Sequence, residues 1–337
     1  MAIPLGNIVT SITQEKMLPQ VVENFYTGNA LFMRLRGKRK VWSTGYRLNI
    51  PTEVAGRTQL GSYSGADTFG TTQEDVRQNF VISPAQYYAN LTITGIQAAA
   101  NRGEEGIVNL MSAEFESVSR ALADTMGTDL YGDGTGNSNK AITGLVAHVD
   151  DATNVVTYQG LSRNTYTRLR STLTAQSGAL GLDDLAADFD AAQVGSDQPT
   201  LGLTTPAVFT IYEGLLVANS RYTIVQNSQR FTLTAAGIEN AGVNANAGFT
   251  GLMFRGMPII TDDKCTANNL YMLNENYLNL FEMEPSDFFV KSKREGFSWN
   301  GWKQPTNQDV IVSQLLWYGQ LVGTQPRKHS RRTGITS

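Results

Sequence analysis

The chain has 337 residues, of which 41% are hydrophobic and 17% are charged, and its formal net charge is −3. This length and apolar content are enough to bury at least one full core and favour about two domains. The nearly balanced charge excludes a polycation that wraps nucleic acid and an acidic disordered chain.

The sequence carries no recognisable targeting or membrane segment. Its start, MAIPLGNIVTSITQEKMLPQ, has no basic stretch followed by the compact apolar run of a secretory signal. The longest uncharged stretch near the end, residues 310–326, is interrupted by Gln and Gly and falls short of the roughly 20 apolar residues of a membrane helix. Cys265 is the only cysteine, so no internal disulfide can form, as expected for a protein folded in a reducing cytoplasm.

Residues 1–40 are predicted to form an N-terminal arm. Up to about residue 33 the arm mixes apolar residues with Gly and Pro, and it then leads into a basic cluster. This cluster consists of Arg34, Arg36, Lys38, Arg39 and Lys40. We interpret it as a solvated face; the alternative is a contact with an acidic partner or with nucleic acid.

Strand patterns dominate residues 42–96. Apolar and polar residues alternate over 46–50, 76–82 and 87–93, as they do on half-buried strands. The polar, Gly-rich segment QLGSYSGADTFGTTQ interrupts them. A long hairpin of this kind has too little apolar area to be stable alone, so a hairpin that projects from the body would need a neighbouring subunit to pack on.

The strongest helix prediction covers residues 103–131. Glu104 and Glu105 lie at its start, where they oppose the positive end of the helix dipole. At about 1.5 Å per residue the helix would be on the order of 40 Å long, and we interpret it as a spine. The turn residues of YGDGTGNSN end it. Its mostly apolar stripe at helical spacing consists of Ile107, Leu110, Met111, Glu114, Val118, Ala121, Leu122, Thr125 and Met126.

The rest of the chain mixes short helices and strands, which predicts an α+β fold. Amphipathic helices are expected in 182–193, with Asp183 and Asp184 in the first turn, and in 204–216, with Thr205 as the cap and Pro206 at the first helical position. Later strands are expected at 288–291, 297–302 and 310–321. The chain closes on a basic run without interleaved aromatic residues, for which we favour contacts with other subunits over contacts with DNA. This run consists of Arg327, Lys328, Arg331 and Arg332.

Residues suited to catalysis or metal binding are few. His148 and His329 are the only histidines, and with one cysteine they exclude zinc ribbons and paired-histidine metal sites. A Ser-His-Asp arrangement around His148 stays open, but no nucleophile-elbow pattern supports it. The segment GDGTGNSNKA is not a phosphate loop, because Ala141 follows Lys140 where a Ser or Thr would bind magnesium.

Adjacent carboxylates occur at 150–151, 183–184 and 262–263, and we interpret them as solvated acids and not as acid–base catalysts. We therefore predict that the chain is not an enzyme and has no catalytic, cofactor-binding or metal-ligating residue.

The order of these parts resembles the major capsid proteins of tailed bacteriophages, which have the Hong Kong 97 fold. The most specific segments are DLYGDGTGNSNKAITGL at 129–145 and FRGMPIITDD at 254–263. The second is similar to a strand pair that this family commonly carries before its last segment. The resemblance extends over essentially the whole chain.

The resemblance implies four parts. Residues 1–40 would form the N-terminal arm and residues 41–95 the extended β-hairpin loop. Residues 96–140 and 285–337 would form a peripheral domain with the spine helix and the late strands, and residues 141–284 an axial domain. A return of the C-terminal end to the axial domain is an alternative within this assignment.

The implied function is structural. Copies of the chain would assemble through hexamers and pentamers into the icosahedral head that encloses the double-stranded DNA of a tailed phage, in the cytoplasm of a bacterial host. Other expected partners are a scaffolding protein, a portal protein, DNA held non-specifically on the inner face and, as a further candidate, a decoration protein. Head-to-tail contacts between identical chains close into rings, and a reaching arm and hairpin multiply weak contacts.

Two features depart from some members of this family. The hairpin begins so near the start that no room is left for an N-terminal scaffolding segment, so we expect a separate scaffolding protein. No lysine occurs between Lys40 and Lys140, so a Lys–Asn isopeptide bond cannot start from the extended loop. Boiling in detergent should therefore release single chains and no ladder of covalent oligomers.

Three alternatives stay open. An encapsulin-like bacterial compartment would share the fold and enclose cargo enzymes in place of a genome. A β-rich phage tail or adhesin protein would suit the strand patterns but not the long helix. An enzyme is the alternative with the least support.

Overall fold

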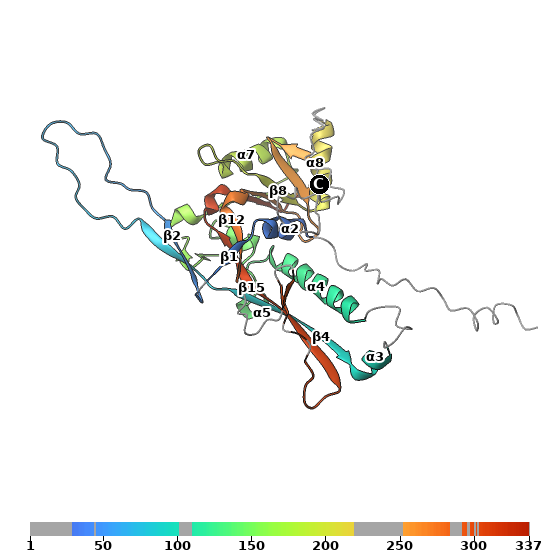
Figure 1. Ribbon diagram of the computed structural model, residues 1–337. Coiled ribbons are helices and arrows are strands. Elements are labelled where there is room, and N and C mark those ends of the chain that lie inside the picture. Colours follow the sequence, from blue (N-terminus) through green and yellow to red (C-terminus); the bar gives the residue numbers. More distant parts are fainter. Residues whose placement is uncertain are drawn as a thin grey trace, which may run out of the picture. The chain divides into compact units, whose positions relative to one another are not determined.

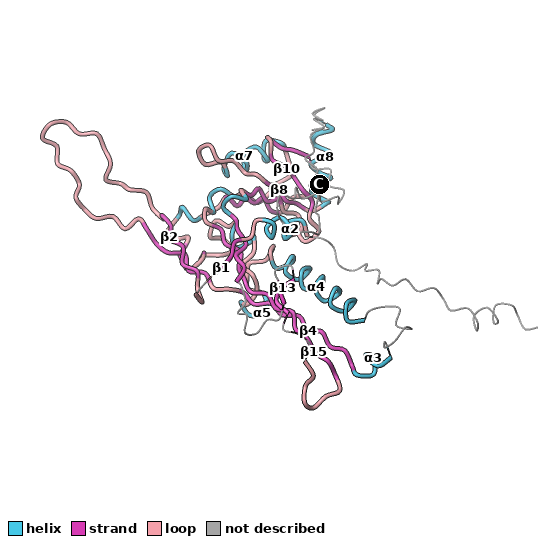
Figure 2. Tube along the Cα trace, in the orientation of Figure 1, coloured by secondary structure: helices cyan, strands magenta, loops and turns pink. Residues whose placement is uncertain are grey.

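The structure is a computed structural model that describes residues 29–43, 45–100, 110–218, 252–283, 292–294, 297–299, 301 and 303–336 (Figures 1 and 2). Its internal contacts divide the chain into two units. The larger unit comprises Thr27–Tyr87, Asp124–Glu284 and Trp317–Ser337, and the smaller comprises Met1–Tyr26, Tyr88–Ala123 and Pro285–Leu316. Most of the predicted arm, residues 1–28, lies outside the described residues.

A six-stranded mixed sheet forms the first core of the larger unit. Strand β8 pairs in parallel with β10 and antiparallel with β11. The last strand of the chain, β16, is inserted between β7 and β11. In spatial order the strands are β7 Thr172–Ala175, β16 Ser330–Thr333, β11 Leu270–Leu273, β8 Leu201–Thr204, β10 Met257–Thr261 and β9 Leu252–Phe254.

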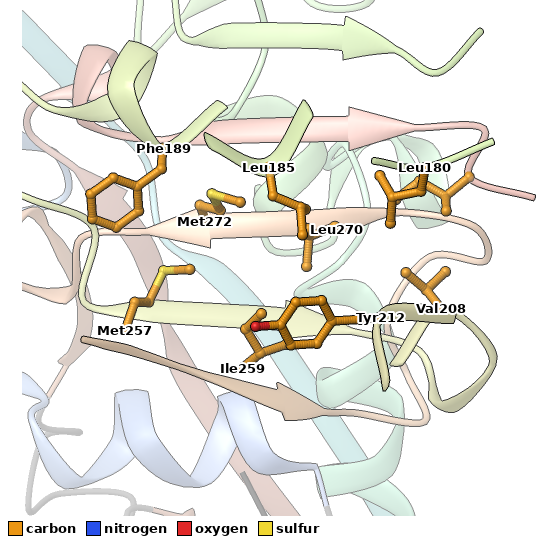
Figure 3. Packing of buried hydrophobic residues seen from close by; sticks show 10 residues of the cluster. Leu180, Leu185, Phe189, Val208, Tyr212, Met257, Ile259, Leu270 and Met272 are labelled. Carbon is orange, nitrogen blue, oxygen red and sulfur yellow. The ribbon is translucent and has the colours of Figure 1, made fainter. Parts of the chain in front are cut away.

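Helices α7 (Leu182–Ala192) and α8 (Pro206–Ala218) pack on this sheet. Alternate residues of β10 and β11 point to the same face, where they meet the apolar stripes of the two helices (Figure 3). Both helices agree with their predicted ranges. The buried cluster consists of Leu180, Leu185, Phe189, Val208, Tyr212, Met257, Ile259, Leu270, Met272 and Ile335.

Each unit contains strands that pair with a part of β15 (Val310–Gly323). In the larger unit β12 (Leu278–Met283) pairs in parallel with β1 (Lys40–Trp42) and antiparallel with the second half of β15. In the smaller unit β14 (Phe297–Trp299) pairs with β13 (Ser292–Arg294) and with the first half of β15. Strand β4 (Ala85–Thr94) also pairs with β15. The predicted strand at 310–321 is confirmed, whereas the one at 288–291 lies entirely outside the described residues.

The predicted hairpin is present as β2 (Leu48–Glu53) and β3 (Arg77–Ile82), which pair antiparallel from Leu48↔Ile82 to Glu53↔Arg77. A second, much smaller hairpin consists of β5 (Thr157–Tyr158) and β6 (Leu161–Ser162). Both contribute to the second core of the larger unit. The buried members of this core are Trp42, Val54, Phe80, Ile82, Tyr158, Leu169 and Val322.

The long helix is α4, Leu110–Asp129. It lies within the predicted range of 103–131, and the predicted first turn with Glu104 and Glu105 lies outside the described residues. The shorter helices are α2 Ala30–Gly37, α3 Gly95–Ala100, α5 Gly136–Asn139 and α6 Leu145–His148, and single 3₁₀ turns occur at Thr167–Leu169, Glu275–Tyr277 and Pro326–Lys328.

The segment after α4 is a tight turn that depends on its glycines. Asn137, Ser138 and Asn139 have positive φ angles, so α5 is a left-handed turn and not a regular helix. Gly144 lies so close to the end of α4 that a Cβ atom would come within 2.5 Å of the carbonyl oxygens of Asp129 and Leu130. This close approach explains why the chain needs glycine at that position.

Candidate assembly interface

The β2–β3 hairpin is buried at its root and exposed beyond it. Val54, Val76, Phe80 and Ile82 are buried at the root. Between Val54 and Val76 no residue is buried. In Figure 1 this loop runs out beyond the ends of the two strands and returns. The root is thus part of the chain's own core, while the loop has no core of its own.

The exposed loop carries large apolar side chains, which we call the tip residues: Leu60, Tyr63 and Phe69. Their exposed fractions are 78%, 67% and 62%. The rings of Tyr63 and Phe69 meet edge to face, with centroids 4.9 Å apart. Single apolar residues are common on protein surfaces, but three on one projecting loop favour a contact with another molecule.

Polar bonds across the loop hold its two arms together. The backbone N–H of Thr58 donates to Glu74 Oε1 at 2.8 Å, and Gln59 Nε2 donates to the carbonyl of Thr72 at 2.6 Å. The hydroxyl and N–H groups of Thr58 lower the pKa of the Glu74 carboxyl, because both hydrogen bonds favour its charged form. Hydrogen bonds between the two arms of the loop therefore hold the tip residues in a defined arrangement.

The residues that the sequence left open for catalysis are built into the core. His148 is fully buried, and its Nδ1 lies 2.9 Å from the Tyr158 hydroxyl. Burial and the nearby Arg163 guanidinium lower the pKa of His148 to about 3. Ser171 Oγ donates to the carbonyls of His148 and Pro326 and not to the imidazole ring. In the described residues, no hydrogen bond from a serine to the His148 ring supports the Ser-His-Asp hypothesis.

The three carboxylate pairs also have structural roles. Asp150 is buried and accepts hydrogen bonds from the backbone N–H groups of Ala152, Asn154 and Val155. Asp184 accepts the N–H of Gly181 and closes the first turn of α7. Asp262 is buried and accepts the N–H of Leu31 and the Tyr131 hydroxyl. The solvated interpretation was wrong for Asp150 and Asp262.

In the described part of the chain, no three His, Cys, Asp or Glu side chains gather as a metal site would require.

The basic cluster at the end of the arm makes ion pairs within the chain. Arg34 donates two hydrogen bonds to the Glu275 carboxylate, at 2.7 and 2.9 Å, and Lys38 lies 3.4 Å from the same group. Arg39 lies 3.3 Å from Glu282. The interpretation as a solvated face is therefore wrong for Arg34, which attaches α2 to the body of the larger unit.

The C-terminal basic run is mostly buried, so the expectation of subunit or DNA contacts is wrong for three of its four residues. Arg332 donates to Asp188 Oδ2 at 2.6 Å and to the Asp184 carbonyl at 2.9 Å. Lys328 pairs with Asp197, and Arg331 lies at the ring of Tyr271. Within this run, only Arg327 is exposed.

In the described residues, no helix is both long enough and apolar enough to cross a membrane.

No family model matches the sequence, and no curated protein matches it. Solved shell structures do match over nearly their full length. The capsid of cyanophage A-1(L) matches with a TM-score of 0.69 and 17% identity, over 98% of this chain and 99% of that one. The capsid of the Myoviridae phage XM1 matches at 0.61 and 13%, over 99% of both chains. The SrpI encapsulin of Synechococcus elongatus matches at 0.59 and 10%, over 99% and 96%.

At these identities the likeness establishes the fold. The chain has the α+β fold of phage capsid proteins, which confirms the predicted Hong Kong 97-like fold class.

Proposed function

We propose that the chain is the major capsid protein of a tailed phage, which assembles through hexamers and pentamers into the icosahedral head around double-stranded DNA. The observation that carries this proposal is the match to two phage capsids over almost the whole of both chains.

In this proposal the parts have the roles that the sequence resemblance implies. Residues 1–40 are the arm, 41–95 the extended loop, 96–140 with 285–337 the peripheral domain, and 141–284 the axial domain. The extended loop lies on a second copy of the chain and buries the tip residues there. A two-stranded hairpin is marginal by itself in water, so this contact supplies the packing that the loop lacks.

The proposed partners are further copies of the chain, a separate scaffolding protein, a portal protein and the packaged DNA, with a decoration protein as a further candidate. The chain acts in the virion, is assembled in the bacterial cytoplasm and has no catalytic role. Cohesion is non-covalent, because the extended loop has no lysine from which an isopeptide bond could start.

An encapsulin-like compartment is the second candidate, because the SrpI shell matches at 0.59. The higher score of the cyanophage capsid, 0.69, favours the phage capsid. The contents of purified particles distinguish the two: DNA of genome length supports the capsid, whereas a cargo enzyme without DNA supports the compartment.

Negative-stain electron microscopy of the purified chain, expressed with and without the scaffolding protein, tests the proposal. Closed shells, tubes or rings of capsomers are expected. Monomers or dimers alone under both conditions would contradict it.

The role of the tip residues is tested by the triple variant Leu60→Ser, Tyr63→Ser and Phe69→Ser. We expect it to fold and to lose assembly, because it removes only exposed apolar groups. The matched control is Met33→Ser, Val156→Ser and Met253→Ser, which changes three exposed apolar residues elsewhere and should still assemble. Equal assembly of both variants would exclude the tip residues from the interface.

A further inference from the structure

The root of the extended hairpin is joined to its unit through the small β5–β6 hairpin. The N–H of Val81 donates to the carbonyl of Gln159 at 2.9 Å. The ring of Phe80 meets the ring of Tyr158 edge to face, with centroids 5.6 Å apart. Tyr158 and Gln159 are consecutive residues in a hairpin whose strands have two residues each. Any displacement of Tyr158 is therefore transmitted to β3.

Tyr158 is itself held by a buried histidine. Its hydroxyl donates to the carbonyl of Gly323 at 2.7 Å and lies 2.9 Å from His148 Nδ1. Because the only hydroxyl proton goes to Gly323, Nδ1 is the donor to the Tyr158 oxygen, and the neutral imidazole is left with an unprotonated Nε2. This atom is buried and has no hydrogen-bond partner. The backbone of Leu321 and Thr143 raises the pKa of His148, but burial lowers it by more.

A proton on Nε2 would place a second cation next to Arg163. The guanidinium lies 4.5 Å from the centre of the Tyr158 ring, and its Nη2 lies 3.2 Å from the carbonyl oxygen of His148. Arg163 cannot move away, because it donates to four carbonyls, those of Ala147, His148, Val155 and Leu169. The positive charges of Arg163 and a protonated His148 would repel each other in this buried site, which lowers the pKa of His148.

The other charged groups nearby do not offset this repulsion. Asp150 lies 3.8 Å from Arg163, but its carboxylate is already held by backbone N–H groups and has Arg331 at 4.0 Å. Electrostatic repulsion from His329 lowers the pKa of His148 further. Repulsion from Lys328 likewise lowers the pKa of His329. The strands of the β5–β6 hairpin have only two residues each, so we expect this hairpin to be displaced first.

The geometry points to an acid-sensitive switch: protonation of His148 displaces Tyr158 and frees the root of the β2–β3 hairpin. The switch is a property of the single chain. It rests on the proposed function only in that the freed hairpin would then change its contact with a neighbouring subunit.

Hydrogen–deuterium exchange of the unassembled full-length chain tests this inference without requiring shells. In the freed state His148 regains an ordinary pKa of 6.5, whereas its pKa in the closed state is about 3. The opening equilibrium should therefore rise about 30-fold between pH 7.5 and pH 5.0. After correction for intrinsic exchange rates, this rise is expected in the amides of 77–82 and 157–162 and not in those of β8 or β11.

The two histidines provide a matched comparison. His148→Gln should abolish the acid-induced rise, and His329→Gln should keep it, because His329 does not contact Tyr158 or β3. If His148→Gln does not fold, Tyr158→Phe serves in its place: it keeps the ring against Phe80, removes the hydroxyl and should show raised exchange at both pH values. An acid-induced rise that persists in His148→Gln, exchange in Tyr158→Phe no higher than in the natural chain, or a rise that is uniform over the larger unit would overturn the inference.

Discussion

At the scale of single residues, the larger unit contains buried arginines, each of which has partners within the chain. Arg163, Arg331 and Arg332 are all buried. Arginine is rarely buried unless it is paired, and each of these has carbonyls, carboxylates or an aromatic ring around it. The polar interior therefore specifies which strands and turns meet, in addition to the apolar packing.

Arg332→Ala should lower the free energy of unfolding by about 3–5 kcal/mol, because it leaves the buried carboxylate of Asp188 without its partner. Urea unfolding of the unassembled chain, followed by circular dichroism, measures this loss. The control is Arg327→Ala, an exposed neighbour, with an expected change within about 0.5 kcal/mol. Equal effects of the two variants would contradict the assignment.

The two buried histidines predict that stability falls in acid. Burial lowers the pKa of His148 to about 3 and of His329 to about 4, whereas an unfolded histidine takes up its proton near 6.5. The unfolded chain thus binds more protons below pH 6.5, so the stabilisation is complete above that pH and is lost as the pH falls towards 4. Each histidine contributes at most about 1.4 kcal/mol per pH unit in this range.

Urea titrations at pH 7.5, 6.0 and 5.0 measure this slope. The double variant His148→Gln, His329→Gln should show a shallower loss than the natural chain over the same range. An unchanged slope would mean that other groups cause the acid sensitivity.

At the scale of elements, the extended hairpin has a buried root and an exposed loop. Its root is buried with the second core, while its loop contributes no buried residue. The helix α2 shows the opposite arrangement, because Leu31, Phe32 and Leu35 are buried and Arg34 is paired with Glu275. Helix α2 thus contributes to the fold of the chain, whereas under the proposed function the loop of the hairpin contributes to a contact with another copy.

Replacement of residues 57–73 by Asn-Gly should change the free energy of unfolding by no more than about 1 kcal/mol, because no buried contact is lost and the loop becomes shorter. Assembly should be abolished, as judged by electron microscopy and sedimentation. A Gly/Ser linker of the original length in the same place should give the same result. Assembly of the linker variant would show that the chemistry of the loop is not needed.

At the scale of the whole molecule, the last strand completes a sheet formed by earlier parts of the chain. Strand β16 lies between β7 and β11, and Ile335 belongs to the buried cluster of α7 and α8. Without β16, both neighbouring strands would have an unpaired edge, and the buried carboxylate of Asp188 would lose the Arg332 guanidinium.

A chain that ends after Thr324 should therefore fail to form the β8-containing sheet, which circular dichroism and loss of a cooperative urea transition would reveal. A chain that ends after Ile335 keeps every contact of β16 and should unfold within about 0.5 kcal/mol of the natural chain. A cooperative transition in the shorter variant would contradict the central role of β16.

Local patterns in the sequence were enough to predict the main elements. The alternation over 76–82 and the helical spacing over 182–193 report which face of a segment is apolar, and this depends only on residues near one another in the chain. The fold class followed from the order of these elements, and the absence of lysine between Lys40 and Lys140 means that a Lys–Asn isopeptide bond cannot start from the extended loop.

Only the tertiary structure decided where the charges lie. From the sequence alone, the basic run at 327–332 is expected to be exposed. Its strand β16 enters the sheet between strands that lie more than fifty residues earlier in the chain, and no local pattern shows this. Likewise, Arg332 meets Asp188, and Tyr158 meets His148 and Phe80, only once distant segments have packed together. Pairing between distant strands fixes these contacts, and periodicity within a segment carries no information about which strand will be its neighbour.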